Sequence, residues 1–219
     1  MFDNEEFTLA GTLTLPEGEP PYAAAVIVSG SGAQARDGNL SPTADIDIYR
    51  LLADALTRQG LAVLRYDDRG VGMSEGDFAS ATIRDFATDA TAAVQYLRDR
   101  DDINTDQVGV IGHSEGGVVA PLVANQVPEL GFVISLAGST VDGEDVLAQQ
   151  NRDILLAEGA SEEYADEQVR LNRALSQAIR TRDEAQIEAA LRELITFQTQ
   201  DADIDETQFE QLLQQNLTQ

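Results

Sequence analysis

The chain has 219 residues, enough for a folded domain with a sizeable core, and its 39 acidic residues against 14 basic ones give a formal net charge of -25. A surface this acidic repels nucleic acids and anionic membranes, so we expect neither as a partner. The sequence has no cysteine and one histidine, which excludes disulfides, thiolate chemistry and a multi-histidine metal site. We therefore expect no metal and no cofactor.

All 14 basic residues are arginines. We interpret the excess of carboxylates as an adaptation to high salt, where screening weakens their mutual repulsion. The alternative is an ordinary acidic cytosolic protein. A halophilic chain should melt at a higher temperature as salt is added, and greatest stability at low salt would contradict the interpretation. Residues 1–6 lack the features of a signal peptide, and no apolar run could span a bilayer, so we expect a cytoplasmic protein.

The first 140 residues alternate between apolar strands and amphipathic helices. The expected strands, in chain order, are residues 7–15 (a hairpin or strand pair around Gly11), 22–28, 61–64, 107–111 and 130–136. The expected helices are residues 46–59, 82–98 and 118–124. A polar loop is expected from residue 33 to residue 42. This alternation predicts an α/β fold with a mostly parallel, doubly wound sheet.

Two of these helices have a recognisable apolar face. In the helix 46–59 the expected buried residues are Ile48, Leu51, Leu52, Ala55 and Leu56. In the helix 82–98 they are Phe86, Ala90, Ala93, Val94 and Leu97. Ligands of parallel sheets bind at the carboxyl ends of the strands, so the site is expected where loops follow Val28, Leu64, Ile111 and Leu136.

The character of the sequence changes near residue 140, which divides the chain into an expected core domain, residues 1–140, and a helical segment, residues 141–219. The expected amphipathic helices are residues 145–157, 162–180, 183–198 and 206–217. In the third of them Ile187, Leu191, Leu194 and Ile195 form one apolar stripe. These helices could be a plain packed bundle or a cap over a site in the core domain.

Residues 112–116 read Gly-His-Ser-Glu-Gly, which matches G-x-S-x-G between a predicted strand and a predicted helix. In that setting the serine, Ser114, lies on a sharp turn with its hydroxyl exposed above the sheet. A nucleophilic serine also needs two N–H donors for the oxyanion. We expect these from the backbone of Glu115 and of Ser31, in the Ser-Gly-Ser-Gly loop that follows the strand 22–28. The alternative is a pair of plain glycine-rich turns.

Through these motifs the chain resembles the α/β-hydrolase superfamily. The match runs from about Phe7 to Gly138 through the Ser-Gly-Ser-Gly loop, the segment Asp-Asp-Arg-Gly-Val-Gly-Met-Ser at 67–74 and the Gly-His-Ser-Glu-Gly-Gly turn. It is similar to bacterial serine esterases and serine-aminopeptidase-like hydrolases. The resemblance implies Ser114 as nucleophile, Glu115 and Ser31 as oxyanion donors, a small-molecule acyl substrate and a helical cap, with the charges of residues 67–69 serving to tie loops together.

One departure from the family pattern concerns the general base. The family orders its triad as Ser, then Asp or Glu, then His, whereas the one histidine here is His113, directly before Ser114. Its ring is expected to point away from the neighbouring hydroxyl and to pack. The general base and acid are then not in this chain, which is either the N-terminal part of a longer hydrolase or a degenerate one. We expect weak catalysis, and an exposed edge at residues 130–136 through which two copies could pair.

The functional hypothesis is a serine hydrolase of carboxylic esters or related acyl bonds that forms an acyl-enzyme on Ser114. A degenerate hydrolase fold that serves as a binding or interaction protein is the first alternative. A nucleotide-binding protein is a remote one, because residues 30–35 fit G-x-G-x-x-A after a strand and Asp67 follows the next strand. That motif should open a helix directly, whereas a polar loop is expected here.

Overall fold

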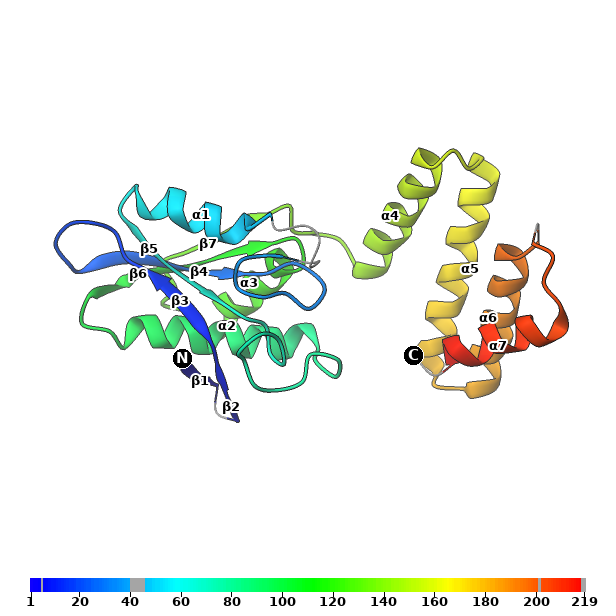
Figure 1. The fold of residues 1–219 in the computed structure, drawn as a ribbon, viewed down its shortest axis with the longest axis horizontal. Helices are drawn as coiled ribbons and strands as arrows, with labels where there is room; N and C mark the ends of the chain where they lie inside the picture. The colour runs from blue at the N-terminus through cyan, green and yellow to red at the C-terminus, as the bar shows by residue number, and fades with distance from the viewer. Residues whose placement is uncertain (5, 40–45, 201, 218–219) are drawn as a thin grey trace. The chain divides into compact units, whose positions relative to one another are not determined.

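The computed structural model describes residues 1–4, 6–39, 46–200 and 202–217. The chain forms two compact units, Met1–Thr140 and Val141–Gln219, drawn in Figure 1. The loop predicted to run from residue 33 to residue 42 is described as far as Asn39, and its last residues lie outside the described part of the chain.

The first unit is built on a five-stranded sheet of order β3-β5-β4-β6-β7. Its strands are β3 (Gly11–Thr14), β4 (Tyr22–Val28), β5 (Leu61–Tyr66), β6 (Ile103–His113) and β7 (Phe132–Leu136). The pairs β4–β5, β4–β6 and β6–β7 are parallel, and β3 adds an antiparallel edge. The central strand β4 has five consecutive buried residues because helices cover both of its faces. The predicted α/β sheet is confirmed.

The hairpin expected within residues 7–15 is wrong. Strand β2 (Phe7–Leu9) pairs antiparallel with β1 (Phe2–Asn4), whereas β3 joins the main sheet through β5. The two strands part at Ala10, whose N–H binds Ser74 Oγ at 2.9 Å and whose carbonyl accepts the N–H of Asp67 at 2.9 Å. A later loop therefore holds Ala10, the residue before Gly11, around which the pattern suggested a turn.

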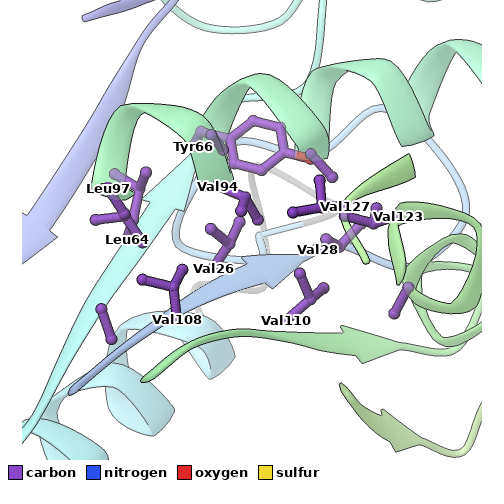
Figure 2. Close-up of a cluster of buried hydrophobic side chains, with 14 of the residues drawn as sticks. Val26, Val28, Leu64, Tyr66, Val94, Leu97, Val108, Val110, Val123 and Val127 are labelled. Atoms are coloured by element: carbon purple, nitrogen blue, oxygen red, sulfur yellow. The ribbon is translucent and has the colours of Figure 1, made fainter. Parts of the chain in front are cut away.

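Helices lie on both faces of the sheet (Figure 1). Helices α2 (Ile83–Arg98) and α3 (Gly116–Gln126) cover one face, and α1 (Ile48–Thr57) covers the other. Figure 2 shows the larger core, in which valines of β4 and β6 face Val94 and Leu97 of α2. Helix α2 begins after Thr82, whose hydroxyl and Asp85 form a reciprocal capping box.

The apolar face expected for α1 is rotated from the observed one. The buried residues are Tyr49, Ala53 and Thr57, while Ile48 and Leu51 are 43% and 54% exposed. Leu52 and Leu56 are half-buried and complete the contact with the sheet. The rotation places an aromatic hydroxyl, that of Tyr49, under the carboxyl end of β4, where the site was expected.

The second unit consists of α4 (Gly143–Ala157), α5 (Glu162–Thr181), α6 (Glu184–Gln198) and α7 (Glu206–Leu217). Its buried cluster contains Leu191, Ile195 and Leu213, so the apolar stripe predicted on α6 is used in packing. Side-chain caps at Asp142, Ser161 and Asp183 start the first three helices. Among the described residues, none of the helices combines the length and the apolar composition that crossing a bilayer requires.

Strand β7 forms one of the two edges of the sheet among the described residues, opposite β3. Its second to fifth residues are exposed, with Val133 at 39% and Ile134 at 43%. An edge of this kind offers unpaired backbone groups to another strand. Pairing of two copies through it stays a prediction.

Candidate nucleophile elbow and oxyanion loop

Ser114 lies on a sharp turn between β6, which ends at His113, and α3, which begins at Gly116. Its φ is +52°, a left-handed conformation that costs an L-residue about 1–2 kcal/mol. The backbone on both sides is fixed, because the N–H of Ser114 binds the carbonyl of Leu136 at 2.9 Å and its own carbonyl accepts the N–H of Gly117 at 2.9 Å. The residue is half-buried, so its side chain is not sealed in the core. This is the strand–turn–helix geometry that the motif predicts.

Two glycines make the turn possible for purely spatial reasons. A Cβ on Gly112 would lie 1.9 Å from the carbonyl oxygen of Gly116, and a Cβ on Gly116 would lie 2.4 Å from the carbonyl oxygen of Val28. Both obstacles are backbone atoms, which a rotamer change cannot move. The motif glycines therefore let the start of α3 pack directly against the end of β4.

The loop after β4 meets the elbow at Gly30. A Cβ built on Gly30 would lie 3.3 Å from Ser114 Cβ and 3.3 Å from His113 Nδ1, so the two segments are in contact. The next residue, Ser31, is exposed. Neither the N–H of Ser31 nor that of Glu115 donates to an acceptor among the described residues. The two N–H groups expected to receive an oxyanion are therefore not used by the described fold.

The ring of His113 packs against Tyr49 of α1. Its Nδ1 lies 3.0 Å from the hydroxyl of Tyr49, and the two rings meet edge to face with centroids 5.9 Å apart. His113 is thus a packing residue, as expected, and that it is not the base for Ser114 stays a prediction.

The charges of residues 67–69 tie loops together, as expected. Arg36 binds Asp67 through its guanidinium, with Nη2 at 2.6 Å, and through its backbone N–H at 2.8 Å. Asp68 accepts Ser29 Oγ at 2.6 Å and the N–H of Gln34 at 2.9 Å. The loop that carries Ser31 is thereby fastened to the loop after β5.

Behind the elbow lies a cavity of about 10 Å³, room for a single water molecule, lined among others by Ser29, Asp68, Asp89 and Glu115. Burial raises the pKa of the Glu115 carboxyl, which disfavours a negative charge beside the site where an oxyanion would form. The cavity is too small for an acyl group.

No cluster of three or more acidic or histidine side chains within the described ranges could hold a metal ion.

Asp68 gives a prediction of pH dependence. Burial raises its pKa from 3.8 to about 6, and the charges of Asp89 and Asp67 add to this, although the bonds from Ser29 and Gln34 oppose it. The unfolded chain releases this proton at lower pH than the folded one, so the stability it confers is present below about pH 4 and is lost as pH rises through about 6. Asp68→Asn can keep both contacts, taking the Gln34 N–H on its oxygen and donating to Ser29 Oγ. We expect it to stabilise the fold by about 2–3 kcal/mol at pH 7.5 and not at pH 4.

Asp67, the neighbouring carboxylate, provides the matched control. Both variants are compared by urea unfolding at pH 7.5 and at pH 4. Burial opposes ionisation of Asp67 too, but the bonds from Arg36 and from the N–H of Met73 outweigh it and lower the pKa. Asp67→Asn should therefore destabilise the protein at neutral pH, and the difference should shrink as pH falls. Equal pH dependence of the two variants would contradict the opposite pKa shifts of Asp68 and Asp67.

The sequence pattern does not indicate Tyr49 or Gln34 as parts of this site. Tyr49 contacts residues 19 and 64 positions away, and Gln34 is 4% exposed in a stretch that reads as a polar loop. A buried glutamine in such a loop leaves no periodic signal. A tyrosine two residues into a helix leaves none either.

Comparison with known proteins agrees with this geometry. The serine aminopeptidase, S33, family matches residues 43–199, more than half of the chain. Esterase EstD of Thermotoga maritima is 31% identical over 153 residues, which are 68% of this chain and 35% of that protein. Two solved structures share the fold at a TM-score of 0.53: Est1E from Butyrivibrio proteoclasticus, with ferulic acid bound, and the α/β hydrolase GrgF from Penicillium sp. sh18.

The two structures are 23% and 22% identical and cover 69% and 73% of this chain, which spans 57% and 54% of theirs. The chain thus spans about a third of the length of the curated relative and a little over half of the solved structures. The elbow, the α/β sheet and the family match together show that the chain belongs to the serine aminopeptidase S33 family of α/β hydrolases.

Proposed function

We propose that this chain carries the nucleophile and the oxyanion donors of a serine hydrolase that cleaves carboxylic esters or related acyl bonds. The observation that carries the proposal is the left-handed φ of +52° at Ser114, held by backbone hydrogen bonds at a strand-to-helix turn. Backbone strain of this kind persists where surrounding structure enforces it, commonly at active sites. The match to an esterase of Thermotoga maritima supports an ester as the substrate class.

In the proposed reaction Ser114 Oγ forms a bond to the carbonyl carbon of the substrate. The carbonyl oxygen becomes an oxyanion that accepts hydrogen bonds from the N–H groups of Glu115 and Ser31. When the tetrahedral intermediate collapses, the bond to the alkoxide breaks and the proton from Ser114 Oγ goes to that alkoxide. Water then cleaves the acyl-enzyme, which gives the acid and regenerates the serine.

We propose further that the chain by itself reacts slowly. Its sole histidine is His113, and the Nδ1 of that residue is engaged with Tyr49. A histidine base for Ser114 would have to come from outside these 219 residues. Loss of a triad member typically costs about 10⁴-fold in kcat, and the remaining rate comes from the oxyanion donors and binding. By the family resemblance, Val141–Gln219 would act as the cap that selects the acyl group.

A fluorophosphonate probe tests both parts of the proposal. We expect slow labelling at Ser114, complete loss of it in Ser114→Ala, and no change in Ser80→Ala, which removes another hydroxyl of the same unit. Labelling at another residue would contradict the assignment of the nucleophile. Rapid, stoichiometric labelling would contradict the expectation of low reactivity.

Two alternative functions can be distinguished from the proposed hydrolase by experiment. If the chain is a degenerate hydrolase fold that binds a partner, Ser114 will not react at all, and capture of the partner will depend on one of the two units. For nucleotide binding, the segment that fits G-x-G-x-x-A should open a helix. Here residues 30–39 are irregular and α1 begins at Ile48, so the structure speaks against that alternative.

A further inference from the structure

Three segments meet at one hydroxyl group beside the elbow. Tyr49 of α1 is 3% exposed, and its hydroxyl oxygen accepts the backbone N–H of Gly30 at 2.9 Å. The same hydroxyl lies 3.0 Å from Nδ1 of His113. Gly30 precedes Ser31, and His113 precedes Ser114. The Tyr49 hydroxyl therefore joins the residue before the proposed oxyanion donor to the residue before the proposed nucleophile.

The direction of these bonds follows from the donors and acceptors around the Tyr49 hydroxyl, with His113 in the tautomer that accepts at Nδ1. The hydroxyl oxygen accepts the N–H of Gly30 at 2.9 Å, and the side-chain Nε2 of Gln34 already donates to the carbonyl of Ser31. Burial raises the pKa of Tyr49, so its hydroxyl keeps its proton. The remaining acceptor for that proton is Nδ1 of His113, which must therefore carry a lone pair. The ring proton of the neutral imidazole is then on Nε2.

Gln34 provides a second anchor for the same loop. Its side-chain Nε2 donates to the carbonyl of Ser31 at 3.1 Å, and its backbone N–H donates to Asp68 at 2.9 Å. The Tyr49 hydroxyl binds the backbone N–H of Gly30, and the Gln34 side chain binds the backbone carbonyl of Ser31. The peptide group between them carries the N–H of Ser31, so its orientation is set from both sides.

We infer that Tyr49 is a positioning residue, whose hydroxyl orients the Ser31 N–H relative to Ser114 by linking Gly30 to His113. The inference deepens the proposed function, on which its catalytic meaning rests. Simple packing would need only the ring of Tyr49, which a phenylalanine supplies equally well. The hydroxyl alone connects the loop to the elbow, and its loss would leave both Gly30 N–H and His113 Nδ1 without this partner.

The test is Tyr49→Phe in the whole chain, with Tyr22→Phe as the matched control. Tyr22 also uses its hydroxyl in a hydrogen bond, to the carbonyl of Gly18 at 2.6 Å, but in the loop before β4. His113 is the only histidine, so the imidazole ¹⁵N spectrum contains one ring. At about pH 8 we expect the Nδ1 signal to move in Tyr49→Phe and to stay in the control.

The orientation of the Ser31 N–H tests the structural part of the inference without any need for activity. Residual dipolar couplings should show it reoriented relative to the sheet in Tyr49→Phe and unchanged in Tyr22→Phe. An unchanged orientation, or an unchanged imidazole spectrum, would overturn the inference. Phosphonylation of Ser114 should slow by about 10- to 100-fold in Tyr49→Phe, because small errors in donor placement are costly in the transition state.

The two hypotheses fail in different ways. Reoriented Ser31 N–H with a phosphonylation rate within twofold of the parent chain would overturn the positioning role. A parent chain that never labels at Ser114 counts against the proposed function, while the couplings still decide whether Tyr49 orients the loop. If Tyr49→Phe is not folded by circular dichroism, Gln34→Met removes the second anchor and is judged by the same two spectra.

Discussion

Replacing Gly112 by alanine is expected to destabilise the first unit by about 3–5 kcal/mol, at the upper end of what single substitutions do. The added Cβ would lie 1.9 Å from the carbonyl oxygen and 2.3 Å from the carbonyl carbon of Gly116. Relief requires the turn at Ser114 to open, which would break the bond from Gly117 N–H to the Ser114 carbonyl. Since domains are stable by about 5–15 kcal/mol, such a loss removes much of the margin.

Two other glycines separate this effect from the general cost of removing a glycine. Gly60 has φ +93° and nothing within 4 Å of an added Cβ, so Gly60→Ala reports conformational strain of about 1–2 kcal/mol alone. Gly143, at the start of α4, has open space and no left-handed φ, so Gly143→Ala should be neutral or slightly stabilising. Urea unfolding followed by circular dichroism, with hydrogen exchange at residues 108–120, measures all three. If Gly112→Ala lowers the free energy of unfolding by less than Gly60→Ala does, the turn at Ser114 is not closed in solution.

The sequence predicts those elements whose formation depends on residues close to them in the chain. The four helices of the second unit were predicted within two residues of their bounds, because amphipathic periodicity and side-chain caps act within a few residues. The hairpin expected around Gly11 failed for the opposite reason. Ala10 is held by Ser74 and Asp67, more than fifty residues away, and these contacts divert the chain into a second sheet.

The same distinction applies to the candidate site. The turn at Ser114 was predictable because glycine, serine and glycine at fixed spacing are all that its local geometry needs. The face of α1 was not, because the helix buries Tyr49 rather than Ile48, and the reason lies in Gly30 and His113. Polar contacts between distant loops outweigh the apolar stripe of a short helix, and they leave no periodicity in the sequence.

The second large effect is expected at Arg69, whose replacement by methionine should cost about 3–5 kcal/mol. Arg69 binds Asp89 with two hydrogen bonds, Nε at 2.7 Å and Nη2 at 2.9 Å, and the two side chains are 11% and 2% exposed. Its Nη2 also donates to the carbonyl of Asp85 at 2.8 Å, and its guanidinium lies 5.1 Å from the centre of the Phe7 ring. Methionine keeps much of the apolar stem but leaves the Asp89 carboxylate buried without its cation.

The pH dependence of the variant identifies the cause. Burial raises the pKa of Asp89, and the bonds and charge of Arg69 work against this rise. Without Arg69 the pKa should rise further above its unfolded value, so Arg69→Met should be least destabilising at low pH and lose stability as pH rises. Asp89→Asn in the same chain removes the unpaired charge, and the double variant should recover part of the loss.

An exposed arginine–aspartate pair provides the control. Arg58 and Asp54 lie 2.8 Å apart on the surface of α1, with side chains 74% and 53% exposed. Because water screens such a pair, Arg58→Met should change the free energy of unfolding by about 0.5 kcal/mol or less. Similar losses for Arg58→Met and Arg69→Met would show that burial does not strengthen the second pair. A clear difference would identify the Arg69–Asp89 contact as the bond that fixes the loop after β5 to α2, and through Asp68 supports the loop of Ser31.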